Sequence, residues 1–175
     1  MSTTFHLRVW TRFLAPLDDV WALKTDPLAL AAEFRPQLSF SLAEEGVARA
    51  RAGEIPTDID ARLRLGPIPP GVRWPIRLLA VEEKKLIRTS SENSLYSRFE
   101  HEMQFETTPD GCRFVDAVTF VSRVPAQKAF AILTQRVFQH RHKVASARLP
   151  TDPQATAVGV LRVMVEDAEE VKKAG

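Results

Sequence analysis

The chain has 175 residues, of which 45% are apolar and 26% charged, and its net charge is +2. These values are typical of one globular domain with a sizeable core, and the small charge does not indicate a nucleic-acid or anionic-lipid partner. The single cysteine, Cys112, excludes an internal disulfide framework and favours a reducing compartment, so we expect a cytoplasmic protein. No apolar stretch approaches the roughly 20 residues of a membrane helix, and no signal peptide is evident, so we expect no integral membrane association.

The N-terminal part of the chain begins with a strand that two short helices follow. Residues 4–13 alternate between apolar and polar side chains, which predicts a strand. Pro16 and Asp18 are typical of a helix start. Pro27 ends that helix, and a second short helix is predicted over residues 28–34.

The middle of the chain is predicted to be rich in strands. Alternating segments lie at 38–45, 59–67, 72–83 and 85–93. Pro75 lies inside the third of these segments and removes a backbone donor, so we place it at a sheet edge or bulge. Residues 96–120 then read as a hairpin with its turn at 108–111.

A single long helix is predicted between Pro125 and Pro150. At 100° per residue, one stripe of this helix collects Ala126, Phe130, Leu133, Val137, Arg141, Val144, Ala145 and Arg148. We expect this stripe to face the sheet, with Arg141 at its centre. About 23 helical residues would span roughly 34 Å, which is enough to cross a whole sheet.

We predict one domain over residues 1–150 and a C-terminal tail over residues 151–175. The tail contains an apolar run from Val158 to Val165 ahead of a charged end. A last helix, an added strand and a partner-binding segment are alternatives for it. If the run is exposed, a homodimer is an open alternative.

The order of the elements and two segments carry a family resemblance. The segments are "APLDDVWALKTDPLAL", after the first strand, and "FEHEMQFETTPDGCRFVDAVTFVSRVP", before the long helix. On these, the chain resembles the START-like superfamily, also called SRPBCC or Bet v 1-like, over most of residues 4–149. The resemblance implies an α+β helix-grip fold. In that fold a curved antiparallel sheet of six to seven strands wraps the long C-terminal helix and leaves a cavity between them. Members of the superfamily bind lipids, polyketides, sterols or hormones, and some are polyketide cyclases, aromatases or cochaperones.

The inner faces of the sheet and the helix supply the candidate pocket wall. Its apolar members are Trp74, Ile76, Leu78, Phe99, Met103, Phe105, Val118, Phe120, Phe130 and Val137. Small-molecule sites are mostly apolar with a few polar groups. In the resembled fold the core and the pocket wall are one surface, so we expect about half of these residues to contact a cavity.

Three polar residues, His101, Asp116 and Arg141, interrupt these apolar positions. The hairpin pattern favours Phe105 near Asp116 and His101 near Phe120, which separates His101 from Asp116 by roughly 13 Å. A touching pair is excluded in that register, so we predict no catalytic residues. Arg141 is the candidate partner of Asp116 or of a ligand carboxylate, and the alternative is that it extends past the helix into water.

The segment 139–143 contains two histidines but does not indicate a metal site. His140 and His142 lie about 200° apart on a helix, so they cannot bind one ion together. We predict no metal and no cofactor. The long helix carries five Lys or Arg and no Asp or Glu. We interpret this basic stripe as a solvated face rather than as a nucleic-acid or membrane surface.

We predict that the chain binds a hydrophobic or amphipathic molecule, lipid- or polyketide-like, between the sheet and the long helix. His101, Asp116 or Arg141 would orient its polar end. One alternative is a cyclase or dehydratase in which His101 or Asp116 acts as a general acid or base. Another is a non-enzymatic interaction module, stress- or chaperone-associated, with a filled core. We favour binding without catalysis.

Overall fold

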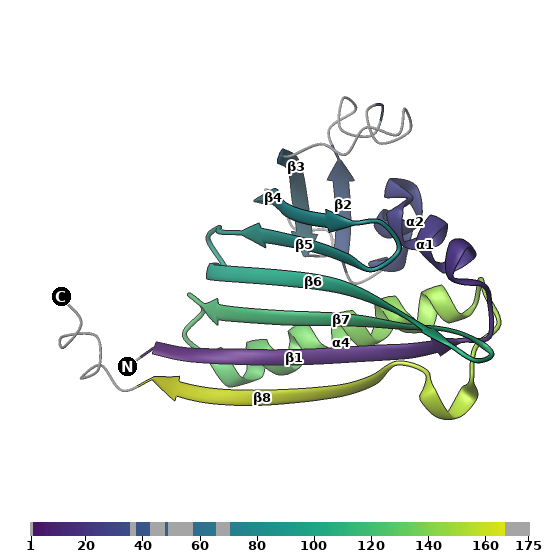
Figure 1. Cartoon of the computed structure of the whole chain (residues 1–175). Coiled ribbons are helices and arrows are strands. Elements are labelled where there is room, and N and C mark those ends of the chain that lie inside the picture. Colours follow the sequence, from purple (N-terminus) through teal and green to yellow (C-terminus); the bar gives the residue numbers. More distant parts are fainter. Residues whose placement is uncertain (1, 36–37, 43–47, 49–57, 66–70, 167–175) are drawn as a thin grey trace.

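The structure, a computed structural model, describes residues 2–35, 38–42, 48, 58–65 and 71–166. Eight strands form one antiparallel sheet in the order β2-β3-β4-β5-β6-β7-β1-β8 (Figure 1). The strands are β1 (Ser2–Phe13), β2 (Leu38–Leu42), β3 (Asp58–Leu65), β4 (Val72–Glu82), β5 (Leu86–Ser91), β6 (Tyr96–Thr108), β7 (Gly111–Ser122) and β8 (Val158–Glu166). The helices are α1 (Leu17–Thr25), α2 (Pro27–Glu33), α4 (Gln127–Ser146) and the short 3₁₀ helix η1 (Pro153–Ala155).

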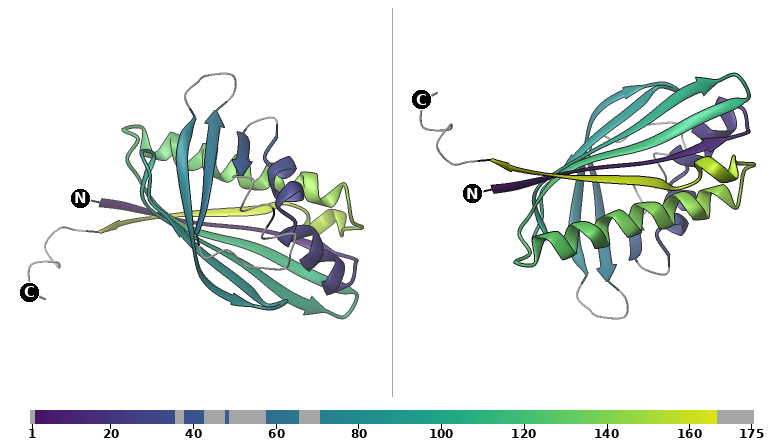
Figure 2. Two further views of the ribbon diagram at one scale, coloured as in Figure 1. Left: turned by 90° about the horizontal axis from the view of Figure 1, so that it is seen from above. Right: turned by 90° about the horizontal axis from the view of Figure 1, so that it is seen from below.

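The sheet curves around the long helix. In Figure 2, α4 runs along the concave face of the sheet, and α1 and α2 lie at one end of that face. This arrangement confirms the predicted α+β helix-grip fold. The sheet has one strand more than the upper end of the predicted number, because the C-terminal segment adds β8 beside β1.

The two short helices begin where the sequence indicated. Pro16 is the N-cap residue of α1, and Asp18 lies in its first turn, where a negative charge complements the helix dipole. Asp26 ends α1 and caps α2, because its side chain accepts a hydrogen bond from the Leu28 N–H at 2.9 Å. Pro27 occupies the first turn of α2, where its missing N–H costs nothing.

Pro75 lies in an interior strand, at a place where the ladder tolerates it. β4 has β3 on one side and β5 on the other, but the pairing with β5 begins only at Arg77. At Pro75 the strand therefore pairs with β3 alone, through Asp60. The local environment is that of an edge, as predicted, although β4 as a whole is not an edge strand.

The C-terminal segment 158–166 is a strand and not a helix. It pairs antiparallel with β1 along its whole length, from Val158 opposite Trp10 to Glu166 opposite Ser2. Of the alternatives for the tail, the added strand is therefore confirmed for these residues, and the helix is wrong. Residues 167–175 lie outside the described part of the chain.

The hairpin of β6 and β7 has a different register from the one predicted. Asp116 pairs with Met103, not with Phe105. The connection is a tight turn at 109–110, whereas the prediction assumed a turn with an extra residue. In the observed register His101 lies opposite Val118 and therefore diagonally across from Asp116. Long side chains in such diagonal positions can contact each other across neighbouring strands.

The helix α4 faces the sheet with small residues as well as large ones. Its buried residues are Ala131, Thr134, Val137, Phe138, Arg141, His142 and Ala145. Leu133 is 47% exposed, and Ala126 and Arg148 are also exposed, so the inward positions predicted for these three are wrong. The predicted stripe followed the large apolar side chains, but small side chains at the contact let a helix lie closer to a sheet.

Candidate functional site

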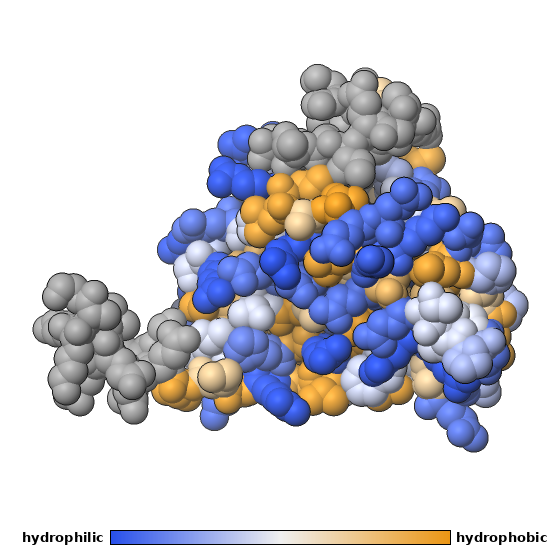
Figure 3. Space-filling model, viewed as in Figure 1, coloured by the Kyte–Doolittle hydropathy of each residue, from blue (hydrophilic) through white to orange (hydrophobic). Residues whose placement is uncertain are grey.

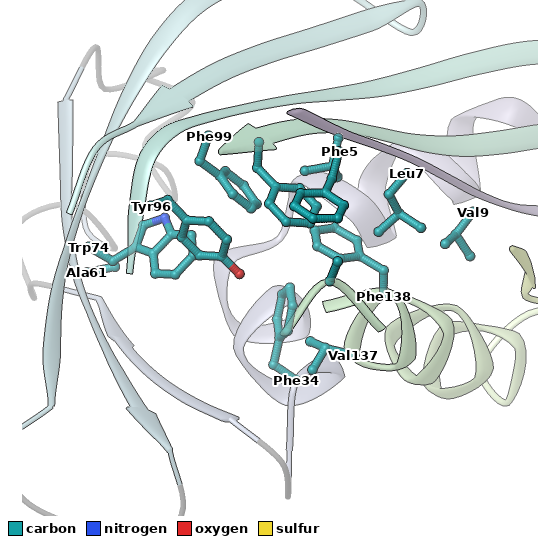
Figure 4. Close-up of a cluster of buried hydrophobic side chains, with 13 residues drawn as sticks. Phe5, Leu7, Val9, Phe34, Ala61, Trp74, Tyr96, Phe99, Val137 and Phe138 are labelled. Carbon is teal, nitrogen blue, oxygen red and sulfur yellow. The ribbon is translucent and has the colours of Figure 1, made fainter. Parts of the chain in front are cut away.

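Buried polar side chains divide the core of the protein into two apolar clusters. The first cluster lies under the N-terminal half of β1 and contains Phe5, Leu7, Val9, Phe34, Ala61, Trp74, Tyr96, Phe99, Val118, Phe120, Ala131, Val137 and Phe138 (Figure 4). The second lies toward the hairpin turn and contains Phe13, Ala15, Val20, Ile87, Met103, Phe105, Cys112, Phe114 and Ala145. The polar residues among them form what we call the central network: Thr11, Lys24, Glu33, His101, Asp116, Arg141 and His142.

Arg141 and Asp116 form the centre of this network. Arg141 Nη1 donates to both carboxylate oxygens of Asp116, at 3.0 and 3.1 Å, and Arg141 Nε donates to Glu33 Oε2 at 2.7 Å. All three side chains are essentially without exposed surface. The prediction that Arg141 meets Asp116 is confirmed, and the alternative that it extends into water is wrong.

The charge of Glu33 is shared between two cations from different elements. Lys24 on α1 donates to Glu33 Oε1 at 2.9 Å, while Arg141 holds the other oxygen. Burial, together with the nearby Arg141, lowers the pKa of Lys24 to about 8 against the opposing effect of Glu33 and Asp116. The ammonium also lies 4.5 Å from the centre of the Phe114 ring.

Burial and the neighbouring charges act in opposite directions on the pKa values of Asp116 and Arg141. Burial tends to raise the pKa of Asp116, but Arg141 and the hydrogen bonds from His101 and His142 outweigh burial and hold that pKa well below its usual value. Burial tends to lower the pKa of Arg141, and here Asp116 and Glu33 outweigh it. The centre of the core therefore keeps a carboxylate and a guanidinium in their charged forms.

His142 connects Asp116 to Thr11 on β1. Its Nε2 lies 3.1 Å from Asp116 Oδ2, and its Nδ1 lies 2.9 Å from Thr11 Oγ1. Thr11 Oγ1 already accepts the Ala157 N–H, so its own hydrogen is free to donate to Nδ1. His142 then donates from Nε2 as a neutral imidazole. Burial lowers the pKa of His142, in agreement with this assignment.

His101 is the accessible member of the network. Its Nε2 lies 2.8 Å from Asp116 Oδ1, and 14% of its side chain is exposed. The prediction that His101 and Asp116 lie about 13 Å apart is therefore wrong, because the tighter turn changes the register. Its ring packs edge-on against Phe138, with the ring centres 5.3 Å apart.

The predicted apolar wall is divided by the central network. Of its ten members, seven are buried, and the other three are partly buried against the core: Ile76, Leu78 and Phe130. Met103, Phe105 and Leu78 belong with the second cluster, and the remaining seven belong with the first. That about half of them contact a cavity stays a prediction.

Aromatic side chains from the sheet surround Tyr96 at one end of the first cluster. Tyr96 packs against Trp74 and Phe99, with ring centres 5.3 and 4.8 Å apart. Its hydroxyl points toward the interior in Figure 4 and donates to Thr134 Oγ1 at 3.0 Å, because that oxygen itself donates to a carbonyl of α4. Burial raises the pKa of Tyr96 to about 12, so the phenol stays neutral.

Sequence reasoning missed Thr11, Lys24, Glu33 and His142 as members of the network. Lysine and glutamate are usually exposed, and Glu33 and His142 each have one partner more than 100 residues away in sequence, Arg141 and Thr11 respectively. The only local signal is that Glu33 interrupts the otherwise apolar run "LALAAEF". Among the described residues, no group of three or more His, Cys, Asp or Glu is placed to hold a metal ion.

One protein-family model matches most of the chain. A family model with the description "Domain of unknown function (DUF8410)" matches residues 11–149. The chain belongs to this family. The match spans α1 to α4 and includes every residue of the central network. A search of curated protein sequences found no match for the chain.

Solved structures share the fold at low sequence identity. Protein CV1439 from Chromobacterium violaceum has a TM-score of 0.64 and 14% identity, over 84% of this chain and 98% of the other. Zhui aromatase/cyclase from Streptomyces sp. R1128 has a TM-score of 0.51 and 18% identity, over 71% and 72% of the two chains. Ara h 8.0201 has a TM-score of 0.53 and 12% identity, over 82% and 99%.

These likenesses establish the fold and not the activity. The resemblance of the chain to the START-like, SRPBCC or Bet v 1-like fold is confirmed by them. No helix within the described ranges is long and apolar enough to cross a membrane. A cytoplasmic location stays a prediction.

Proposed function

We propose that the chain binds a hydrophobic or amphipathic small molecule, lipid- or polyketide-like, between the concave face of the sheet and α4. The observation that carries the proposal is incomplete burial of inward-facing side chains. Several apolar residues pack against the first cluster yet keep accessible surface: Leu30, Val72, Ile76, Leu95, Phe130 and Leu161. His101 also points to the concave face and is 14% exposed. Apolar surface that solvent still reaches beside a buried core can be covered by a ligand.

The energetics favour an apolar molecule with few polar groups. Each Å² of apolar surface removed from water contributes about 25 cal/mol before the costs of association are subtracted. The aromatic rings of Trp74, Tyr96 and Phe99 supply a rigid surface for this purpose. One of the solved structures with this fold carries a name that fits such a role, since Zhui is an aromatase/cyclase.

Native mass spectrometry of the purified protein tests the proposal directly, by detecting a co-purified small molecule. A matched pair of variants on β4 then locates the site. Ile76→Arg places a charge on the concave face, whereas Leu79→Arg changes a residue that is already 50% exposed. We expect Ile76→Arg to weaken binding of an apolar fluorescent probe by at least about tenfold and Leu79→Arg to leave it unchanged. Equal binding by both variants, or no binding by the wild type, would support the interaction module with a filled core instead.

A cyclase or dehydratase is the second candidate, and the contact between His101 and Asp116 favours it. Asp116 accepts from Nε2 of His101, which leaves the lone pair on Nδ1 available as a general base. Nδ1 would take a proton from the carbon next to a bound ketone, and the hydrogen bond from Nε2 to Asp116 would hold the imidazole in the required orientation. Solvent deuterium exchange into a bound diketone, followed by NMR in the wild type and in His101→Phe, tests this step. Exchange that does not depend on His101 removes the enzyme and leaves the binding protein.

We also propose that a second copy of the chain pairs with β8. This strand ends the sheet, so its outer edge has no partner among the described strands. It exposes Val160, Val163, Met164 and Val165, and Figure 3 shows apolar residues along the lower edge, where Figure 1 places β8. Such an edge is a template for strand pairing. Light scattering after size exclusion should give a dimer mass that Met164→Lys reduces to that of a monomer.

A further inference from the structure

The charges of the central network balance without any contribution from a ligand. Lys24 and Arg141 supply two positive charges, and Glu33 and Asp116 supply two negative ones, each within 3.1 Å of an opposite charge. His142 is neutral in its hydrogen-bonded form. An additional buried charge would therefore have no counter-ion in the network, and burying an unpaired charge is costly.

His101 is the point at which a ligand can reach this network. Each of the other members has at most 2% of its surface exposed, whereas His101 keeps 14% of its side chain accessible. Nε2 is occupied by Asp116, and Nδ1 makes no hydrogen bond. The buried side-chain atoms without a partner in the described part of the chain are Arg12 Nε and Thr108 Oγ1, so Nδ1 is reached by solvent.

The hydrogen-bond direction at His101 follows from its partner. Asp116 is a carboxylate and only accepts, so Nε2 carries the hydrogen that joins the two side chains. The four buried charges already balance, so the form of His101 that fits the network is the one that adds no further charge, and in that form Nδ1 holds a lone pair. The accessible nitrogen therefore accepts a hydrogen bond.

From this geometry we infer that the ligand presents an uncharged hydrogen-bond donor, such as a hydroxyl group, to Nδ1 of His101. The inference rests on the proposed small-molecule binding and specifies the class of ligand, which is an apolar alcohol or phenol. A ligand carboxylate would meet the lone pair of Nδ1 and lie next to the charge of Asp116. An ether or ester oxygen would meet the lone pair without a hydrogen to share.

Three probes with the same naphthalene ring distinguish these classes. 2-Naphthol carries a donor, 2-methoxynaphthalene carries only an acceptor, and 2-naphthoate carries a charge. Isothermal titration at pH 7.5 should show 2-naphthol binding about 5–10-fold more tightly than 2-methoxynaphthalene, the effect of one hydrogen bond. 2-Naphthoate should bind at least about tenfold more weakly than 2-naphthol.

Two variants assign the preference to the right histidine. His101→Phe keeps a ring of similar size without the acceptor, so the affinities for 2-naphthol and 2-methoxynaphthalene should become equal. His6→Phe is the matched control, because His6 is paired with Thr119 on the other face of the sheet, and it should keep the preference. Both variants are checked by thermal unfolding, and the wild-type preference decides the inference even if one of them does not fold.

The outcomes separate the inference from the function on which it rests. Equal affinities of the wild type for the three probes, or a preference for 2-naphthoate, overturn the inference and leave small-molecule binding intact. Binding of none of the three contradicts the proposed function and the inference together. A donor preference that survives in His101→Phe also overturns the inference, because the donor would then be recognised elsewhere.

Discussion

Arg141 on α4 and Asp116 on β7 form an ion pair in which neither side chain has exposed surface. The pair joins the long helix to the centre of the sheet, and Glu33 extends it to α2. Removing one partner of such a pair leaves the other charge buried and uncompensated, which costs more than the pair contributes. The stability of this fold should therefore be more sensitive to these residues than to most surface charges.

Replacing Arg141 by methionine tests this expectation. Arg141→Met should lower the free energy of unfolding by about 3–5 kcal/mol, because Asp116 and Glu33 lose their common cation. Arg148→Met is the matched control on the same helix, and since Arg148 is exposed it should change stability by no more than about 0.5 kcal/mol. Urea denaturation of both variants gives the measurement. Equal effects of the two substitutions would show that the buried pair is not a determinant of stability.

The free energy of unfolding should decrease as the pH is lowered below about 6.5, because of His142. Its folded pKa lies below the ordinary value of 6.5, so between these values the unfolded chain binds a proton that the folded protein does not. Lowering the pH therefore favours unfolding. Asp116 adds a second loss at lower pH, because its folded pKa lies below the ordinary value of 3.8 and its contribution, present above that value, disappears as pH falls.

Urea denaturation at pH 7.5, 6.0 and 5.0 measures this dependence. We expect the slope between pH 6.0 and 5.0 to be smaller in His142→Gln than in the wild type, because glutamine cannot take up a proton in the unfolded state. His6→Gln, a change at a histidine on the other face of the sheet, is the control. Identical slopes in wild type and His142→Gln would contradict the assignment of a neutral buried imidazole.

The tight hairpin turn depends on Gly111. A Cβ atom at this position would lie 2.1 Å from the Phe13 carbonyl oxygen, which belongs to the backbone of β1 and cannot rotate away. Gly111→Ala should therefore destabilise the protein by about 2–3 kcal/mol, the upper range for overpacking. Gly159→Ala is a useful comparison, since its Cβ would meet the flexible ends of Gln135 and Gln139. Thermal unfolding that ranks Gly159→Ala as the more damaging change would contradict this account.

Truncation after Pro150 tests the predicted boundary between domain and tail. The shortened chain loses β8 and the Ala157 N–H that Thr11 accepts, and β1 becomes an edge strand. We expect a loss of at least about 3 kcal/mol, since each lost hydrogen bond contributes roughly 0.5–1.5 kcal/mol. The corresponding decrease in Tm is about 6–12 °C. A truncated chain that is as stable as the full chain would show that residues 1–150 fold independently, as the sequence predicted.

The local elements of this fold were predictable because their signals lie within a few residues of one another. Alternation over 4–13 gives β1, and Pro16 with Asp18 gives the start of α1. The segment 158–166 shows the limit of such signals. Its apolar run is compatible with a helix or a strand, and only the free edge of β1 decided between them.

The candidate site was predictable in part. Arg141 stood out because a charge in an apolar helical stripe is unusual, and its partner Asp116 followed from the same argument on a strand. The relation of Asp116 to His101 was not predictable, because it depends on the length of one turn. A shift of two residues in register changed a separation of roughly 13 Å into a hydrogen bond of 2.8 Å.

The sequence by itself determined the helix-grip architecture, the inward apolar faces and the polar interruptions at His101, Asp116 and Arg141. Only the tertiary structure decided which of these groups touch and which charges are buried with them. The physical reason is that periodicity and capping act between near neighbours, whereas burial and ion pairing depend on elements that meet from distant parts of the chain. Lys24 and Glu33 are ordinary helical residues in sequence, and they become part of the central network only when α1 and α2 close the end of the sheet over Arg141.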